Sequence, residues 1–264
     1  MPELPEVETV VRSLAPHVTG LRILNAEFSQ PRVLRGDAEE TARMLTGRTI
    51  ERVGRHGKFI VFTLRPAGFL IVHLGMTGKL LWNGVPAKHT HAVFTLQGGT
   101  LLYNDSRQFG RIEAARELPD NVRKLGPDAL SVSLDDFTGL LRKRKSRMKS
   151  VLLNQTFVRG LGNIYVDEAL FRAGIHPLAV GSKLRKDRVK KLYDAIREVL
   201  NEAIERRGSS ISDYVDSAGE RGSFQTQHRV YQRTGEPCLA CGAAIRRTLV
   251  AQRGTHFCPK CQKK

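Results

Sequence analysis

Two short apolar runs, Lys58-Phe59-Ile60-Val61-Phe62-Thr63-Leu64 and Phe69-Leu70-Ile71-Val72-His73-Leu74, lie a few residues apart in the first half of the chain. The turn-forming segment Pro66-Ala67-Gly68 separates them, and this is the spacing of a β-hairpin. A third run, His91-Ala92-Val93-Phe94-Thr95-Leu96, is likewise followed by a turn-forming segment, Gln97-Gly98-Gly99. Because short turns join antiparallel strands, residues 21–113 are predicted to form an antiparallel sandwich or barrel rather than a parallel sheet.

Helical patterns lie on both sides of this strand region. An N-terminal stripe with helical spacing ends near Pro16 and comprises Leu4, Val7, Val10, Val11 and Leu14. After Gly126-Pro127 the strand pattern stops, and a long apolar helical face follows: Val189, Leu192, Tyr193, Ile196, Val199, Leu200, Ala203 and Ile204. The sequence therefore predicts an α+β protein of several domains, with a β-sandwich and flanking helices at 1–130, a helical domain at 131–225 and a cysteine module at 226–264.

The charge of the chain points to its partner. It carries 43 lysines and arginines against 26 acidic residues, a formal net charge of +17 at pH 7. This excess is more than solubility requires and predicts a polyanionic partner, with nucleic acid as the first candidate. A membrane is less favoured, because no apolar run approaches the roughly 20 residues that span a bilayer and no signal-peptide pattern opens the chain. We therefore expect a cytoplasmic protein.

The densest basic segment holds six cations in eight positions with no acid among them: Arg142, Lys143, Arg144, Lys145, Arg147 and Lys149. Composition alone leaves open whether this run contacts a polyanion or is only a solvated helix face. The segment Gly160-Leu161-Gly162-Asn163-Ile164-Tyr165 favours the first interpretation, because glycines at a helix start let a phosphate approach backbone N–H groups. An ordinary glycine turn is the alternative.

All four cysteines lie in the last 27 residues, as Cys238-x2-Cys241 and Cys258-x2-Cys261. Two such pairs, separated by 16 residues, let four thiolates converge tetrahedrally on one zinc ion and leave no position open for a catalytic water. The zinc is therefore predicted to be structural, and four free thiols are the alternative. The intervening segment has the length of a two-stranded hairpin that presents Arg246, Arg247 and Arg253.

The chain opens with Met1-Pro2-Glu3-Leu4-Pro5-Glu6. Prolines and acidic residues at a helix start are ordinarily structural, since proline fits the first turn and carboxylates complement the helix macrodipole. The functional alternative requires removal of Met1, which exposes a secondary amine that can attack a sugar carbon and form an iminium ion. Of two carboxylates beside such an amine, one could act as general acid and the other could orient the substrate.

Four motifs occur together and in this order: Met1-Pro2-Glu3-Leu4-Pro5-Glu6-Val7-Glu8-Thr9, His73-Leu74-Gly75-Met76, Gly162-Asn163-Ile164-Tyr165 and the four cysteines. With them the chain resembles, over essentially its whole length, the formamidopyrimidine-DNA glycosylases of the superfamily that also contains endonuclease VIII. Leu4 and Glu8-Thr9 resemble the purine-lesion branch. The resemblance implies a β-sandwich catalytic domain, a helix-two-turn-helix DNA-binding domain and a β-hairpin zinc finger.

The same resemblance implies roles for individual residues. Pro2 would be the nucleophile at C1′, Glu3 would assist opening of the deoxyribose, and Glu6 would lie in the active site. Lys58 would contact phosphate and the sugar region. Further DNA contacts are implied for His89 and, at the backbone phosphates around the lesion, for Lys149, Asn163 and Arg253.

Removing a base from duplex DNA requires the nucleotide to leave the stack, so the vacated space must be filled. Met76, Arg107 and Phe109 resemble the family's wedge, in which a thioether and an aromatic ring fill the gap and arginine meets the orphaned base. For Met76 and Phe109 a place in the core is the alternative. Ser106 stands where the family usually has proline, and Gln108 where a basic residue is common, so this loop is expected to be looser or to choose partner bases differently.

The resemblance implies a bifunctional DNA glycosylase and AP lyase of base excision repair. It would excise oxidised purines, such as 8-oxoguanine and formamidopyrimidines, through a Schiff base on the N-terminal proline, and cleave the abasic strand by β,δ-elimination. The expected partner is damaged double-stranded DNA, bound by a monomer in the bacterial cytoplasm at the nucleoid, with one structural Zn2+. The alternatives are an endonuclease VIII-like enzyme for oxidised pyrimidines and a non-catalytic zinc-ribbon DNA-binding protein.

Overall fold

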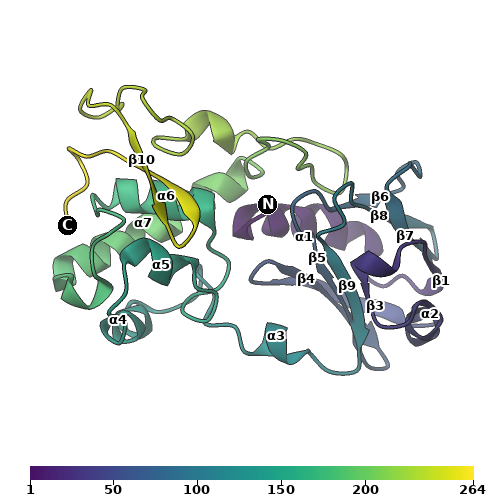
Figure 1. Cartoon of the computed structure of the whole chain (residues 1–264). Helices are drawn as coiled ribbons and strands as arrows, with labels where there is room; N and C mark the ends of the chain where they lie inside the picture. Colours follow the sequence, from purple (N-terminus) through teal and green to yellow (C-terminus); the bar gives the residue numbers. More distant parts are fainter. The chain divides into compact units, whose positions relative to one another are not determined.

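A computed structural model describes all 264 residues, and the chain divides into two compact units (Figure 1). The first, here called the sandwich unit, comprises residues 1–124 and 206–225. The second, the helical unit, comprises residues 125–205 and 226–264. The α+β fold class predicted from the sequence is confirmed.

Two sheets form the sandwich unit. The four-stranded sheet has the order β1-β7-β8-β6, with strands β1 (Ile23–Phe28), β6 (Lys79–Trp82), β7 (Thr90–Leu96) and β8 (Gly99–Asn104). The five-stranded sheet has the order β2-β9-β5-β4-β3, with strands β2 (Leu34–Arg35), β3 (Thr49–His56), β4 (Phe59–Arg65), β5 (Phe69–His73) and β9 (Arg111–Ala115). All pairings are antiparallel except the short contact of β2 with β9.

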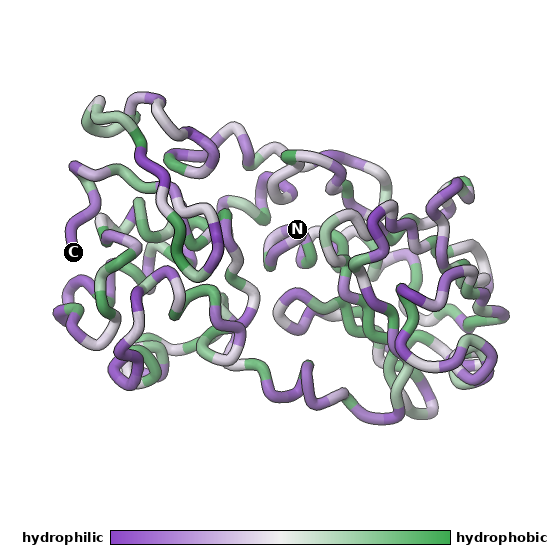
Figure 2. The backbone as a smooth tube through the Cα atoms, in the orientation of Figure 1, coloured by the Kyte–Doolittle hydropathy of each residue, from purple (hydrophilic) through white to green (hydrophobic).

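The predicted strand runs form these sheets because alternate side chains face the core between them. In β4 the inward residues Ile60, Phe62 and Leu64 are almost fully buried, and Leu70 and Val72 of β5 join the same cluster. Figure 2 shows the hydrophobic residues concentrated along these central strands. The hairpin predicted from the turn at residues 66–68 is confirmed, since Thr63 pairs with Phe69 at its closed end.

Helices cover the sandwich. Helix α1 (Leu4–Val18) packs against β3, and α2 (Ala38–Leu45) packs against β1 and β9. The apolar stripe of α1 is buried as expected, although the helix continues two residues beyond Pro16 because a proline near the end forfeits few helical hydrogen bonds. The short elements are η1 (Pro31–Val33) and α3 (Asp120–Arg123).

The helical unit contains α4 (Leu134–Arg142), α5 (Met148–Leu153), α6 (Asn163–Arg172) and α7 (Lys186–Glu205). The short turns η2 (Gly181–Lys183) and η3 (Phe224–Gln227) accompany them. The predicted apolar face of α7 is buried against its neighbours. Near the C-terminus, strands β10 (Arg246–Val250) and β11 (Arg253–Phe257) pair antiparallel as the predicted hairpin. In Figure 2 the tube is hydrophilic over the first part of β10.

The chain divides differently from the sequence prediction, which placed a helical domain at 131–225 and a zinc module at 226–264. Residues 206–225 return to the sandwich unit, where Tyr214 joins the hydrophobic core. Residues 226–264 belong with the helices of 125–205. Contacts between residues some 200 positions apart decide this division, and local sequence patterns do not encode them. No helix of the chain has both the length and the apolar character needed to cross a membrane.

Candidate active site and nucleic-acid interface

The N-terminus of the sandwich unit is tightly packed. Pro2 is buried directly ahead of α1, and Glu3, the N-cap residue of that helix, is 3% exposed. Met1 is half exposed. Glu3 and Glu6 form a capping box, in which the Glu3 N–H donates to Glu6 Oε2 at 2.8 Å. The structure thus brings Pro2, Glu3 and Glu6 together, as the sequence predicted for a site at this end of the helix.

The Glu6 carboxylate is held from a second side by the segment that follows α7. The Ser209 N–H donates to Glu6 Oε1 at 2.7 Å, and the Tyr214 hydroxyl donates to the Glu6 carbonyl at 3.1 Å. Gly208 has a φ of +81° and lies so close that a Cβ there would meet Glu6 Oε1 at 2.8 Å. With both oxygens engaged by backbone N–H groups, Glu6 fixes the helix start. Sequence reasoning missed Gly208, Ser209 and Tyr214.

Lys58 lies in the tight turn between β3 and β4 and is 8% exposed. Arg55 links this turn to α1, because its Nε donates to Glu8 Oε2 at 2.9 Å and its Nη1 donates to the Gly57 carbonyl at 3.2 Å. Burial would raise the pKa of Glu8, but hydrogen bonds from Arg12 and Arg55 outweigh burial and hold that pKa below its ordinary value. Glu8 thereby ties the lysine turn to the helix that begins after Pro2.

His73 ends β5, opposite Phe59 on β4, and the two rings have centroids 4.9 Å apart. Burial, followed by the nearby charges of Lys58, Arg111 and Arg35, lowers the pKa of His73 to about 4. The imidazole is therefore neutral at pH 7 and offers a hydrogen bond beside Lys58 without adding a charge. The sequence placed His73 in a motif but assigned it no role.

The three residues of the predicted wedge lie on two loops of the sandwich unit that Asp105 joins. Asp105 is fully buried; its Oδ1 accepts from the Thr77 hydroxyl at 2.5 Å and its Oδ2 accepts from the Gly110 N–H at 2.8 Å. Thr77 follows Met76, so one carboxylate fixes both loops. Met76 and Phe109 are 39% and 52% exposed, which contradicts the alternative of a core position for either.

Close backbone approach keeps these loops together. A Cβ at Gly75 would lie 2.4 Å from the Gly110 nitrogen, so only glycine fits there. The Arg107 guanidinium lies over the Phe109 ring at 4.8 Å from its centroid. Gln108, one of the departures noted in the sequence, adopts a left-handed φ of 54°, a conformation that costs any non-glycine residue some strain. Exposed Ser106 and His89 lie next to Asp105, whose N–H donates to the His89 carbonyl.

In the helical unit, α6 begins at Asn163 after the predicted glycine segment. Gly160 has a φ of +105°, and its N–H donates to Gln155 Oε1 at 2.9 Å, which orders the turn before the helix. The Asn163 side-chain amide donates to the Gly254 carbonyl at 3.1 Å. Gly254 lies in the β10–β11 hairpin between the two cysteine pairs, here called the zinc hairpin. Arg253, the neighbour of Gly254, is exposed. Two of the predicted phosphate-binding residues are therefore brought together, one at a helix start and one on the hairpin.

Lys149 differs from the other cations of its basic run. Its ammonium is fully buried and donates to Asp167 Oδ1 at 2.5 Å and to the Asn163 carbonyl at 3.4 Å. The predicted contact of Lys149 with phosphate remains a prediction, and it requires this ion pair to open. The run instead exposes four other cations to solvent: Arg142, Lys143, Lys145 and Arg147.

Two adjacent carboxylates of α6 anchor the C-terminal region. Asp167 Oδ2 accepts from the backbone N–H of His256 at 2.9 Å and lies 3.2 Å from its Nδ1. Glu168 accepts the backbone N–H groups of residues 229–231 at 2.8–3.0 Å. Burial raises the pKa of Glu168 although these three N–H groups lower it. Sequence reasoning missed both acids, because nothing in their local pattern distinguishes them from solvated helix residues.

The four cysteines converge. Their sulfurs all lie within 4.8 Å of one another, with Cys238 Sγ 3.9 Å from Cys261 Sγ and Cys241 Sγ 3.5 Å from Cys258 Sγ. Zinc–sulfur bonds of about 2.3 Å in a tetrahedron place sulfurs about 3.8 Å apart, so the geometry fits one zinc ion. The predicted structural zinc site is confirmed. All four ligand positions are protein thiolates, and the metal can only support the hairpin.

A helix start led by glycines beside a four-cysteine hairpin with exposed arginines is typical of a nucleic-acid-binding protein with a zinc finger. The formamidopyrimidine-DNA glycosylase N-terminal domain matches residues 1–112, its H2TH domain matches residues 125–215, and the zinc finger found in FPG and IleRS matches residues 235–264. The matched ranges together span almost the whole chain.

Similar proteins agree with this class. The formamidopyrimidine-DNA glycosylase of Solibacter usitatus is 62% identical over 265 residues and covers 100% of both chains. The crystal structure of a complex between a variant of the Lactococcus lactis FPG and a Fapy-dG containing DNA has a TM-score of 0.92 at 40% identity, over 100% of both chains. A complex between the Lactococcus lactis Fpg and an abasic site containing DNA has a TM-score of 0.90 at 40% identity, over 99% of this chain and 100% of that one. The chain belongs to the formamidopyrimidine-DNA glycosylase family of DNA-repair glycosylases.

Proposed function

We propose that the protein is a bifunctional DNA glycosylase and AP lyase that excises oxidised purines, 8-oxoguanine and formamidopyrimidines, from duplex DNA in the bacterial cytoplasm. The observation that carries the proposal is the buried pair of Pro2 and Glu3 ahead of α1, at a helix start that Glu6 fixes from two sides. A nucleophile and an acid are thereby preorganised. The DNA substrates of the two Lactococcus lactis complexes, one carrying Fapy-dG and one an abasic site, support both activities.

The proposed reaction begins once Met1 is removed. The Pro2 nitrogen bonds to C1′ while the N-glycosidic bond breaks, and the base leaves with that electron pair and a proton. Glu3 gives a proton to O4′ as the sugar ring opens, which leaves an iminium between Pro2 and C1′. Loss of a C2′ proton then expels the 3′ phosphate, and loss of a C4′ proton expels the 5′ phosphate. Water hydrolyses the iminium and restores the proline.

The other residues have supporting roles in this proposal. Lys58, held beside α1 through Arg55 and Glu8, contacts phosphate near the sugar. Met76, Arg107 and Phe109 fill the space of the extruded nucleotide. Phosphates on either side are contacted by His89, Asn163, Arg253 and Lys149, the last once its ion pair opens. Zinc keeps Arg253 in place through the hairpin.

Borohydride trapping followed by mass spectrometry tests the nucleophile. Reduction of the iminium gives a stable adduct, which we expect on Pro2 of protein that has lost Met1. The control is a protein with one glycine inserted ahead of Pro2, which should bind the duplex equally well and give no adduct. An adduct on an internal lysine such as Lys58, or full activity with Met1 retained, would overturn the mechanism.

Incision assays on matched duplexes test the substrate class. Duplexes carrying 8-oxoguanine or a formamidopyrimidine should be incised faster than a duplex carrying an oxidised pyrimidine at the same position. Faster incision at the oxidised pyrimidine would favour the endonuclease VIII-like alternative. Binding without incision or trapping at any lesion would leave the non-catalytic zinc-ribbon alternative.

The salt dependence of binding tests the phosphate contacts. If roughly six phosphates are neutralised, log affinity should fall with log salt at a slope of about −5. Replacing the exposed Lys143 and Lys145 by alanine should make the slope shallower by up to about 2, because each lost phosphate contact removes about 0.9. An unchanged slope would mean that the basic run is only solvated.

A further inference from the structure

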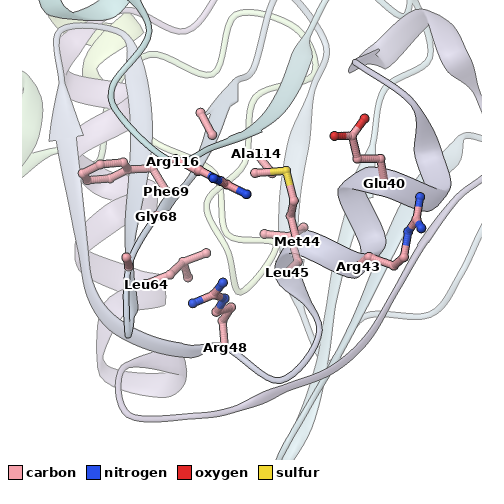
Figure 3. A pocket seen from close by; sticks show the side chains of 12 residues that line it. Glu40, Arg43, Met44, Leu45, Arg48, Leu64, Gly68, Phe69, Ala114 and Arg116 are labelled. Atoms are coloured by element: carbon pink, nitrogen blue, oxygen red, sulfur yellow. The ribbon is translucent and has the colours of Figure 1, made fainter.

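A hollow of about 340 Å3 lies in the sandwich unit, where α2 meets the ends of β4, β5 and β9 (Figure 3). Its volume falls within the range of about 300–1,000 Å3 of ligand-binding pockets. Most of its lining is apolar or small: Met44, Leu45, Leu64, Ala67, Gly68, Phe69, Ala114 and Ala115. The charged lining consists of three arginines and one glutamate, Arg43, Arg48, Arg116 and Glu40. We call this hollow the arginine pocket.

The arginines of this pocket are not neutralised within the protein. Arg48 and Arg116 form no ion pair or side-chain hydrogen bond in the structure, and Arg43 donates only to the Glu39 carbonyl at 3.4 Å. Other arginines of the same unit do have acid partners, as Arg65 has Glu51 at 3.5 Å. Unpaired guanidinium groups that line one concavity favour a ligand with carboxylate or phosphate groups.

The arrangement of the side chains separates the charges. In Figure 3, Arg48 and Arg116 lie with Leu64 on one side of Met44, whereas Arg43 and Glu40 lie together on the other. The Glu40 carboxylate therefore lies on the Arg43 side, where no ion pair joins the two, and no acid lines the side of Arg48 and Arg116. The side that holds Arg48 and Arg116 combines two unneutralised cations with an apolar floor.

Strand register places the arginine pocket away from the catalytic residues. Phe59 and His73 pair at one end of the β4–β5 ladder, next to Lys58, while Thr63 and Phe69 pair at the other, next to the pocket. Four residues of strand separate the two ends by about 13 Å. An occupant of the pocket would leave the N-terminal proline site open.

We propose that the arginine pocket docks an acidic peptide segment of a partner protein, with carboxylates at Arg48 and Arg116 and an apolar side chain on the half-buried Met44 and Phe69. The apolar floor argues against a free phosphate ion, which would leave these surfaces without contacts. The same floor and the concave shape argue against a nucleic-acid backbone, which needs an open basic track. Arginine with a buried apolar anchor is a combination enriched at the energetic centres of protein interfaces.

Fluorescence anisotropy tests this docking with a labelled peptide of four acidic residues around one leucine and one phenylalanine. The full-length protein is first saturated with undamaged duplex DNA, so that its phosphate-binding residues are occupied. We expect salt-sensitive binding that weakens at least tenfold in the double variant Arg48→Ala/Arg116→Ala. The double variant Arg32→Ala/Arg52→Ala removes the same charge from exposed positions outside the pocket and should change binding less than twofold.

Further measurements decide between the alternatives. A peptide with serine in place of the leucine and phenylalanine should bind at least fivefold more weakly, and incision by the pocket variant should match that of the unaltered protein. Equal weakening in both double variants, peptide binding that occurs only in protein free of duplex DNA, or competition by millimolar inorganic phosphate would each overturn the proposal. Absence of any peptide binding would do so as well.

Discussion

The sandwich unit and the helical unit fix their functional residues by different means. In the sandwich unit, buried carboxylates accept uncharged donors: Glu6 is held by backbone N–H groups and Asp105 by a hydroxyl and N–H groups. In the helical unit, Glu168 is also held by backbone N–H groups, but the buried Asp167 pairs with the ammonium of Lys149, and four cysteines form a site for a zinc ion. Carboxylates held by uncharged donors depend on the close packing of neighbouring segments. The Asp167–Lys149 pair and the zinc site depend instead on opposite charges that neutralise one another.

The difference has an energetic consequence. A carboxylate held by backbone donors loses stability gradually when one contact is weakened, because each hydrogen bond contributes about 1 kcal/mol net. Removing one partner of a buried ion pair leaves an uncompensated charge in the protein interior. Removing the metal leaves its four ligands without the bonds that fold the segment around them. The helical unit should therefore be more sensitive to single chemical changes than the sandwich unit.

Zinc removal should have the largest effect. Refolding in a chelator should leave residues 235–264 without stable structure, because a structural zinc contributes on the order of 10 kcal/mol to local folding. Hydrogen exchange should show β10 and β11 fully exchanging while β4 and β5 stay protected. The control is the same refolding with excess zinc. Protected β10 and β11 in metal-free protein would show that packing alone holds the hairpin.

Asp167→Asn should have the next largest effect. It leaves the Lys149 ammonium buried and unpaired, which costs about 3–5 kcal/mol, measurable by urea denaturation. The second substitution Lys149→Met should restore most of the lost stability. The matched control is Asp194→Asn, which breaks an exposed Lys190–Asp194 pair and should shift the urea midpoint far less. Similar losses in the two single variants would contradict the role of burial.

Gly208→Ala tests the close fit of the sandwich unit. The added Cβ forces a positive φ on alanine and meets Glu6 Oε1, so we expect a loss of about 1–3 kcal/mol and slower adduct trapping. Gly219→Ala is the control, because its φ of +85° is similar and no atom lies within 4 Å of its Cβ. If thermal unfolding shows the same loss in both variants, the contact with Glu6 contributes nothing.

Glu8→Gln should have the smallest effect, and only over part of the pH range. The pKa of Glu8 is lowered in the folded protein, so the folded state binds fewer protons and the Glu8 ion pairs stabilise it above the ordinary value of 4.5. That contribution, less than about 1 kcal/mol, is lost as the pH falls through the lowered pKa. The stability difference between unaltered protein and variant should shrink from pH 6 to pH 3. A constant difference would exclude this ion pair as its source.

Local patterns were enough for most of the fold. Two short apolar runs separated by a turn segment predicted the β4–β5 hairpin, the apolar stripe predicted α1, and the spacing of the cysteines predicted the zinc site. In each case the signal lies within a few dozen residues, because turn chemistry, side-chain alternation and ligand geometry act at short range. The roles of Pro2, Glu3, Glu6 and Lys58 came from the family resemblance rather than from local patterns, and they stay predictions.

Long-range contacts account for what the sequence left open. The return of residues 206–225 to the sandwich depends on the fit of Gly208 and Tyr214 against Glu6, some 200 residues away. In the sequence the six cations of the basic run are indistinguishable. In the structure Lys149 alone is fully buried, because Asp167 on another helix neutralises its charge. Asp105 joins two loops whose wedge residues are far apart in sequence.

The amino-acid sequence by itself predicted the β4–β5 hairpin, strand β7, helices α1 and α7, the zinc ligands and a nucleic-acid partner, since each follows from apolar runs, spacing or net charge. The tertiary structure alone decided which carboxylates are buried, which cation of the basic run is withdrawn from solvent, and where the arginine pocket lies. These depend on the desolvation and pairing of groups that only folding brings together.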